Sequence, residues 1–181
     1  MKGMIFNLFE HFICDAFTEE SWDKIIESSQ LIHGNETYIP KAFADEDFKC
    51  LVVAANRELH LAVPDLLEMF GKYSFPHIME KFPNYFKQAS HCFDVIMRLD
   101  EIISKDMREA LPNEYLPEVF IKPVEGNIIE IEYKSKRKLC EYLEGLIYGC
   151  AHHFKNNIQI HHHHCMHYGH DYCGLRIVKE I

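Results

Sequence analysis

Apolar residues recur at helical spacing through the first 110 residues of the chain. A helix is predicted to begin at Thr18-Glu19-Glu20-Ser21, where a threonine can cap the first turn. Asp45 can cap a second helix, and Pro64 suits the first turn of a third. A longer amphipathic helix is predicted from Phe93 to about Glu109, ending before Pro112. The apolar faces of these helices are Trp22, Ile25 and Ile26; Phe48, Leu51, Val52 and Ala55; Leu66, Leu67 and Phe70; and Phe93, Ile96, Met97, Ile103 and Met107.

The pattern changes after Pro117, where apolar and polar residues begin to alternate as they do in strands. Strands are predicted at 119–122 and 128–133, with Glu125-Gly126-Asn127 as the turn between them. A helix is predicted at 138–154, and the last strands at 158–165 and 173–179. The inward side chains of that helix are Leu139, Leu143, Leu146 and Ile147. Helices followed by a mostly antiparallel sheet with one inserted helix predict an α+β fold.

Composition narrows the class of protein. A chain of 181 residues that is 48% hydrophobic can form one good core, so a single domain is expected over 1–181. The net charge of −9, with basic residues scattered, argues against nucleic acids and anionic membrane surfaces as partners. Glu10, His11 and Asp15 interrupt any signal peptide, and no apolar run is long enough to span a membrane. Seven cysteines without such a signal point to a reducing cytoplasm.

The segment Tyr133-Lys134-Ser135-Lys136-Arg137 carries the first candidate site. On an extended segment, Tyr133, Ser135 and Arg137 share one face. A phenol, a hydroxyl and a guanidinium on one side form a donor clamp for a carboxylate or phosphate. An ordinary polar strand end is the alternative interpretation of this spacing.

The second candidate site is a cysteine–histidine tail. Cys165 and Cys173 lie four residues on either side of Gly169, so a hairpin turn there would place them opposite one another. Two thiolates with at least one imidazole suit tetrahedral zinc. Strict strand alternation puts His163 and His167 on the face of Cys165. The nearby histidines are His161, His162, His163, His164, His167 and His170.

Five features occur in order along the whole chain: the opening Met1-Lys2-Gly3-Met4-Ile5-Phe6-Asn7-Leu8-Phe9-Glu10; Phe82-Pro83-Asn84-Tyr85-Phe86; Leu116-Pro117; Ile131 to Lys138 leading into Gly145-Leu146-Ile147-Tyr148-Gly149; and the tail from Cys165 to Cys173. In these features the chain resembles the H-NOX family, the haem nitric oxide/oxygen binding domains, over its whole length. The resemblance implies the H-NOX fold, divided into an N-terminal helical part (1–60) and a remainder (61–181). It also implies that Tyr133, Ser135 and Arg137 grip haem propionates and that Pro117 presses on the haem.

The chain departs from the family where haem-binding members supply a proximal histidine. Counting back from Pro117 places that position at Ser104, and the count from Phe82 leaves Ile103 as the other candidate. Neither residue can ligate iron as imidazole does, and no histidine occurs between His91 and His152. Substitute ligands could be His77 or His91. The family would also place Tyr142 on the distal haem side and would line the pocket with Phe9, Leu66, Leu67, Phe70, Phe75 and Ile78, which in any fold would be core.

The resemblance also completes the zinc site. It implies Cys140 as a further ligand, beside Cys165 and Cys173, and His162 as the histidine. Strand alternation disagrees with His162, and a β-bulge would reconcile the two; His164 and His167 stay as alternatives. The other cysteines, Cys14, Cys50, Cys92 and Cys150, are expected to be small buried hydrophobes.

The expected function is that of a stand-alone sensor domain acting on a separate protein, which in the family is typically a histidine kinase or a cyclic-di-GMP enzyme. No catalytic constellation is present, so an enzyme is not expected. Three hypotheses follow: a zinc-containing sensor of thiol oxidation with weak or absent haem, a haem sensor of nitric oxide or oxygen with a substitute axial ligand, and a degenerate scaffold that only binds a partner. The first accounts for most of the features.

Overall fold

The computed structural model describes residues 2–29, 31, 45–108 and 115–180. Glu109 and Pro112, where the predicted long helix was to end, lie outside these residues. The chain forms two compact units, 1–70 and 71–181, and the division expected between residues 60 and 61 stays a prediction. Among the described residues, no helix combines the length and apolar character needed to cross a membrane.

The first unit is helical, with α1 (Lys2–Ala16), α2 (Glu19–Ser28), α3 (Asp45–Leu59) and the start of α4 (Val63–Lys81). Thr18 caps α2 as predicted, because its side chain accepts a hydrogen bond from the Ser21 amide at 3.0 Å. Phenylalanines fill the core: the ring of Phe9 lies 5.0 Å from that of Phe70 and 5.4 Å from that of Phe48, both edge to face.

The second unit contains a four-stranded antiparallel sheet. Its strands are β1 (Glu118–Pro123), β2 (Ile128–Lys134), β3 (Ile158–His164) and β4 (Cys173–Lys179), in the order β1-β2-β4-β3. Gly126, at φ +60°, makes the predicted turn between β1 and β2. The last strand in the chain therefore lies inside the sheet, and its first residue, Cys173, pairs with Tyr133 of β2. The predicted α+β class is confirmed.

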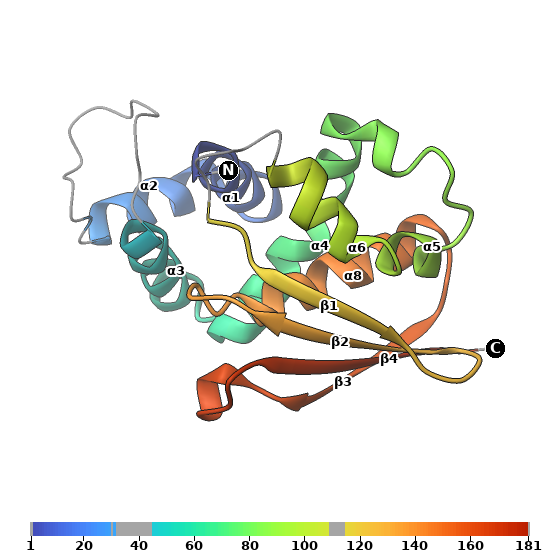
Figure 1. Ribbon diagram of the computed structural model, residues 1–181. Coiled ribbons are helices and arrows are strands. Elements are labelled where there is room, and N and C mark those ends of the chain that lie inside the picture. The colour runs from blue at the N-terminus through green and yellow to red at the C-terminus, as the bar shows by residue number, and fades with distance from the viewer. Residues whose placement is uncertain (1, 30, 32–44, 109–114, 181) are drawn as a thin grey trace. The chain divides into compact units, whose positions relative to one another are not determined.

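The helix α8 (Cys140–His153) lies over one face of this sheet, together with α5 (Cys92–Ile96) and α6 (Leu99–Glu101) (Figure 1). It begins two residues later than predicted, because Lys138 adopts a left-handed conformation with φ +51°. Glycines bring α8 close to the second half of α4. A Cβ on Gly71 would meet the Tyr142 carbonyl oxygen and come within 2.7 Å of the Leu146 amide nitrogen. Backbone contact of this kind leaves little freedom in the position of the first turns of α8.

The single long helix predicted from residue 93 is wrong. The chain forms α5 (Cys92–Ile96), α6 (Leu99–Glu101) and a π-helical stretch, η2 (Ile102–Met107). The break falls at Arg98, whose backbone (φ −109°, ψ 6°) leaves the helical region. Ile96 and Ile103 are buried as predicted, whereas Met97 beside the break is 39% exposed. A short 3₁₀ turn, η1 (Pro83–Tyr85), precedes these elements.

Candidate functional site

Four side chains of the predicted zinc site meet in the second unit. Cys140 is the first residue of α8, His162 lies on β3, Cys165 precedes the 3₁₀ turn η3 (Met166–Tyr168), and Cys173 begins β4. One ligand atom from each lies within 4.8 Å of the other three. The thiols of Cys140 and Cys165 are 3.9 Å apart. All three cysteines are buried and unpaired by disulfides, and His162 is half-buried.

Backbone amides surround two of these sulfurs. The Met166 amide donates to the sulfur of Cys173 at 3.3 Å, and the His167 amide donates to that of Cys165 at 3.4 Å. Both donors belong to the η3 loop, which closes with Gly169 in a left-handed conformation, φ +90°. Amide donors stabilise sulfur most when it carries negative charge, so this loop is suited to thiolates.

A bulge in β3 decides which histidine joins the sulfurs. The β3–β4 register runs His162 opposite Leu175 and then His164 opposite Gly174, so His163 is the extra residue. Gly174 makes room for it, since a Cβ there would lie 2.8 Å from Nε2 of His163. Simple alternation would have turned His162 away from Cys165; the bulge allows His162 to point towards the cysteines.

The two alternative histidines have other neighbours. His167 Nε2 lies 2.9 Å from the Lys138 carbonyl oxygen and 3.8 Å from Oε2 of Glu141, and His167 groups with Cys140 and Glu141 as a second possible ligand set. The ring of His164 contacts those of His170 and Tyr172, with centroids 4.8 and 5.6 Å apart. Among the described residues, His164 belongs to no group of converging metal ligands.

Burial and nearby carboxylates shift the pKa values of the side chains in the cluster. Burial raises the pKa of the Cys140 thiol, and the Glu141 carboxylate raises it further. Burial also raises the pKa of Cys173, against the opposing effect of the Met166 amide. The pKa of His162 is raised by Glu144, whose Oε1 is 2.7 Å from Nδ1. Nε2 of His162 is buried without a hydrogen-bond partner in the described residues. Three sulfurs and one such nitrogen fit tetrahedral zinc.

The predicted clamp is only partly extended. Tyr133 and Ser135 are buried, and burial raises the pKa of the Tyr133 phenol. β2 ends at Lys134, and a turn closed by the Lys138 amide and the Ser135 carbonyl oxygen (3.1 Å) follows. Arg137 therefore lies in that turn, so the shared extended face was wrong for this residue. Its amide donates to Oγ of Ser135 at 3.2 Å.

Tyr115 lies beside this turn. Its hydroxyl accepts a hydrogen bond from the Lys136 amide at 3.0 Å, and its ring centroid is 5.8 Å from the guanidinium carbon of Arg137. A buried hydroxyl, a phenol and a guanidinium still lie within five residues. This segment offers donors that suit a propionate or another carboxylate.

The two residues expected at the axial haem position, Ser104 and Ile103, carry no imidazole. Ser104 is exposed in η2, and Ile103 beside it is 8% exposed. A hydroxyl and an aliphatic chain do not replace histidine on haem iron. Thus the clamp fits a haem carboxylate, whereas the residues at the expected axial position do not fit haem iron.

The remaining residues of the expected haem site are placed as follows. Pro117 is half-buried just before β1. Burial raises the pKa of Tyr142 to about 12, an effect that the Ser74 hydroxyl partly offsets. His91 caps α5 by accepting from the Phe93 amide, and the ring of His77 packs on that of Tyr73 at 4.9 Å. Both histidines therefore have structural contacts.

The cysteines outside the cluster differ in burial. Cys92 and Cys150 are buried as expected, but Cys14 and Cys50 are only half-buried, so the prediction was wrong for them.

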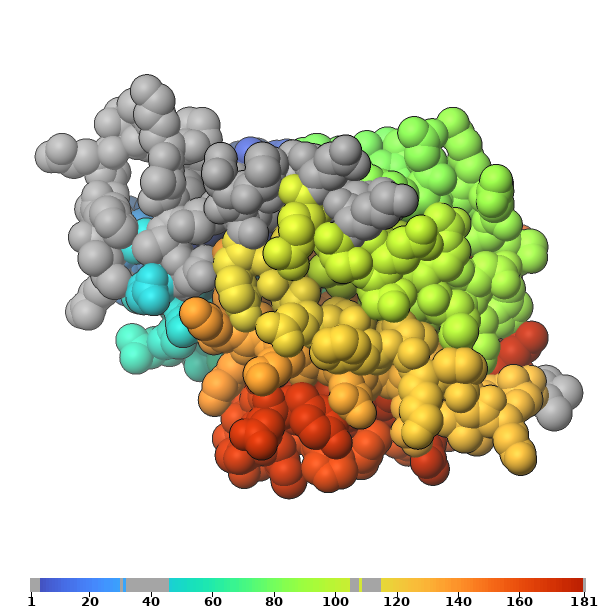
Figure 2. Space-filling model, in the orientation of Figure 1, coloured from blue at the N-terminus to red at the C-terminus, as the bar shows by residue number. Residues whose placement is uncertain are grey.

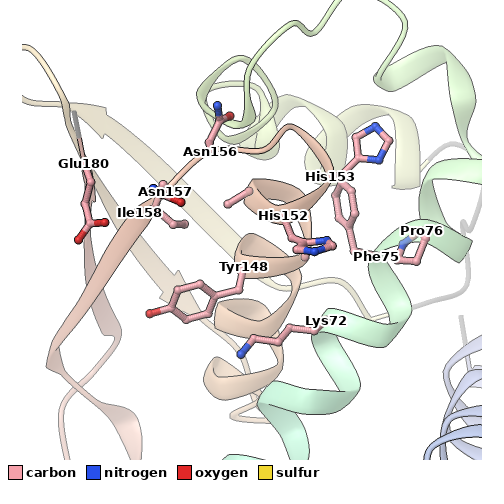
Figure 3. A pocket seen from close by; sticks show the side chains of 12 residues that line it. Lys72, Phe75, Pro76, Tyr148, His152, His153, Asn156, Asn157, Ile158 and Glu180 are labelled. Carbon is pink, nitrogen blue, oxygen red and sulfur yellow. The ribbon is translucent and has the colours of Figure 1, made fainter.

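A groove of about 640 Å³ lies between α4, the C-terminal end of α8 and the start of β3 (Figure 3). The ammonium group of Lys72 is 4.9 Å from the centroid of the Tyr148 ring there. The groove is at the opposite end of α8 from Cys140.

Sequence reasoning did not identify Glu144. The signal was available, because Glu144 follows Cys140 by four residues and so shares its face of α8. What could not be read from the chain was that His162 would lie opposite that face.

The sequence model of the Haem-NO-binding (HNOB) family matches residues 2–162, most of the chain. The chain belongs to the Haem-NO-binding family. This is the H-NOX resemblance described above, and it is confirmed. The family consists of sensor domains that bind haem. A comparison with curated proteins gave no match.

Solved H-NOX structures share the fold. An H-NOX protein from S. oneidensis in the Fe(II)NO ligation state is 26% identical, with 100% of each chain covered and a TM-score of 0.89. The Fe(II) unliganded H-NOX protein from K. algicida is 22% identical over 100% of this chain and 97% of its own, also with a TM-score of 0.89. A mutant H-NOX from T. tengcongensis is 22% identical over 100% and 98%, with a TM-score of 0.82.

Proposed function

We propose that this Haem-NO-binding domain is a sensor of thiol oxidation that holds zinc at Cys140, His162, Cys165 and Cys173, binds haem weakly or not at all, and regulates a separate protein. The observation that carries this is the convergence of four donor atoms from four elements within 4.8 Å. Buried thiols rarely gather in this way without a metal or a disulfide, and these cysteines are not disulfide-bonded. Zinc would hold the sulfurs as thiolates, the reactive form.

The sensing chemistry needs only the chain's sulfurs and an oxidant such as hydrogen peroxide. A thiolate attacks one peroxide oxygen, forming a sulfenic acid and releasing hydroxide. A second thiolate then attacks the sulfenic sulfur and displaces another hydroxide, which leaves a disulfide. The two sulfurs lose two electrons, and the peroxide gains them; the two hydroxides released take up two protons from the buffer and become water. The sulfurs of Cys140 and Cys165 lie 3.9 Å apart, which suits this step.

Oxidation would change the surface next to the cluster. The amides of Met166 and His167 would lose charged acceptors, and a disulfide sulfur no longer binds zinc. The η3 loop carries Tyr168, which is 87% exposed. The segment containing β3, this loop and β4, red in Figure 2, lies at the molecular surface. A partner contacting the loop would therefore sense its loosening.

The test begins with metal analysis of the purified protein, in which zinc near one per chain is expected. Peroxide or hypochlorite should then release zinc and change the activity of the partner. Both effects should be lost in Cys165→Ala and Cys173→Ala and kept in Cys50→Ala, a half-buried cysteine outside the cluster. Zinc-free wild-type protein, or an oxidant response that persists without these cysteines, would overturn the proposal.

The second candidate is a haem sensor of nitric oxide or oxygen with a substitute axial ligand. The observation in its favour is that Tyr133 and Ser135 are buried next to Arg137. Together the three side chains offer hydrogen-bond donors for haem propionates. It predicts a sharp Soret band after expression with excess haem and a nitric oxide response that survives loss of the tail cysteines. If neither zinc nor a Soret band is found, the remaining explanation is a scaffold that only binds its partner.

The partner is proposed by class only. Family membership favours a histidine kinase or a cyclic-di-GMP enzyme in the cytoplasm, where reduced thiols would persist until an oxidant appears. The net charge of −9 favours a basic contact surface on that partner. The expectation that the chain has no catalytic activity of its own stays a prediction.

A further inference from the structure

Glu144 stands directly behind the histidine of the cluster. Its Oε1 lies 2.7 Å from Nδ1 of His162, and the two side chains are only 14% and 19% exposed. The contact has the length of a charge-assisted hydrogen bond, although the two groups are not aligned as one. The pair joins the first turns of α8 to β3.

The two ring nitrogens of His162 face different surroundings. Nδ1 faces the Glu144 carboxylate, which can only accept a proton in a hydrogen bond. Nε2 is buried and has no hydrogen-bond partner among the described residues. A buried ring nitrogen is costly unless a metal ion or a hydrogen-bond partner satisfies it. The carboxylate therefore favours the tautomer with the proton on Nδ1 and the lone pair on Nε2.

Glu144 itself does not join the cluster. The group of converging ligand atoms contains Cys140, His162, Cys165 and Cys173 and excludes Glu144. The neighbouring carboxylate, Glu141, has different contacts, at 3.2 Å from the Cys140 sulfur and 3.8 Å from His167. Among the residues that the structure describes, Glu144 is therefore the one whose carboxylate lies within 4.0 Å of His162.

We propose that Glu144 is a positioning residue that fixes the tautomer and the orientation of His162, so that Nε2 faces the three sulfurs and binds zinc. The proposal rests on the proposed zinc site and adds the residue that prepares its histidine. Carboxylates behind metal-binding histidines act in this way, and their loss typically weakens metal binding by about 10- to 100-fold.

The experiment compares wild type, Glu144→Ala, Glu144→Gln and Glu180→Gln in the full chain. Zinc affinity is measured by competition with a chromophoric chelator. Glu144→Ala should bind zinc about 10- to 100-fold more weakly. Glu144→Gln should recover part of the loss, because its amide oxygen accepts the same proton. Glu180→Gln is the matched control: Glu180 accepts from Gln159 of the same strand at 2.6 Å, at the other end of β3.

Nitrogen-15 NMR of the imidazoles supplies a readout that packing alone would not move. In zinc-loaded wild type, His162 should carry its proton on Nδ1, and in Glu144→Ala this signal should shift or broaden. If the wild type binds zinc but Glu144→Ala and Glu144→Gln match it in affinity and in the His162 signal, Glu144 has no positioning role and the zinc site stands. If the wild type binds no zinc, the site itself fails. Should Glu144→Ala not fold, the Glu144→Gln comparison decides.

Discussion

The cysteine–histidine cluster and the anion clamp are neighbours built in opposite ways. Cys140 follows Arg137 by three residues, and Tyr133 of the clamp pairs with Cys173 of the cluster across β2 and β4. The clamp is local, because its donors all come from one five-residue segment. The cluster draws its donors from α8, β3, the start of η3 and β4, which meet only in the folded unit.

This difference affects how much each site says about function. A local segment can retain a phenol, a hydroxyl and a guanidinium for packing, as the contacts of Tyr115 with this turn show. Convergence of four potential ligands from distant parts of the chain has fewer structural explanations. The cluster is also complete, whereas the expected axial position beside the clamp carries Ser104. The thiol site therefore supports a function more strongly than the haem site does.

Removal of zinc should lower the stability of the protein, and this is the largest effect that we expect. If stability does not change, the cluster no longer supports a function more strongly than the clamp does. With free zinc about 1,000-fold above its dissociation constant, binding stabilises the fold by about 4 kcal/mol. For a chain of this size that corresponds to a rise in Tm of about 10 °C. Calorimetry with and without a chelator measures it. Equal melting temperatures for the two forms would show that the cluster holds no structural metal.

As pH falls, the zinc affinity of the cluster should decrease more steeply than that of a zinc site on the protein surface. The pKa values of Cys140 and Cys173 are raised by burial, so both thiols are protonated at neutral pH until metal binds. Binding then releases at least two protons, and affinity falls as pH falls, by about 100-fold or ~2.7 kcal/mol per pH unit. Chelator competition between pH 6 and 8 measures the slope. Cys140→Ser should reduce the slope, and a flat profile in the wild type would exclude thiolate ligands.

A histidine at the expected axial position tests the clamp as a haem site, because it should strengthen haem binding. Ser104→His, or Ile103→His if the register differs by one residue, supplies the imidazole that the clamp lacks. Haem affinity should rise about tenfold or more, equivalent to about 1.4 kcal/mol. Titration followed at the Soret band is the measurement, with Ser104→Ala as control. If neither histidine variant shifts the band, the clamp does not belong to a haem site.

Gly174→Ala should have the smallest effect. The added Cβ would lie 2.8 Å from the imidazole of His163, but that ring is the far end of an exposed side chain and can swing away. Stability and zinc affinity should change by about 0.5 kcal/mol or less. Loss of zinc in this variant, restored in Gly174→Ala/His163→Ala, would instead mean that the ring of His163 does not move away and that its clash with the new Cβ displaces the bulge.

The sequence predicted elements better than it predicted orientations. Alternation located β1 to β4, and the Thr18 cap located α2, because these signals are local. The direction of His162 depends on a bulge that Gly174 accommodates from the neighbouring strand, and alternation within β3 gave the opposite face. The break at Arg98 and the turn that contains Arg137 likewise depend on backbone conformation, which the pattern of apolar residues does not predict. Cys140 and His162 came from family resemblance.

The place of β4 inside the sheet has a consequence for how the protein is made. During synthesis β1, β2 and β3 leave the ribosome before β4, yet β2 and β3 are joined only through it. Until Cys173–Lys179 emerges, the inner edges of both strands lack their partner, a state prone to mispairing. The same strand brings the last cysteine of the cluster. Completion of the sheet and completion of the proposed zinc site are therefore a single event in biosynthesis, and zinc supply at that moment should influence the yield of correctly folded protein.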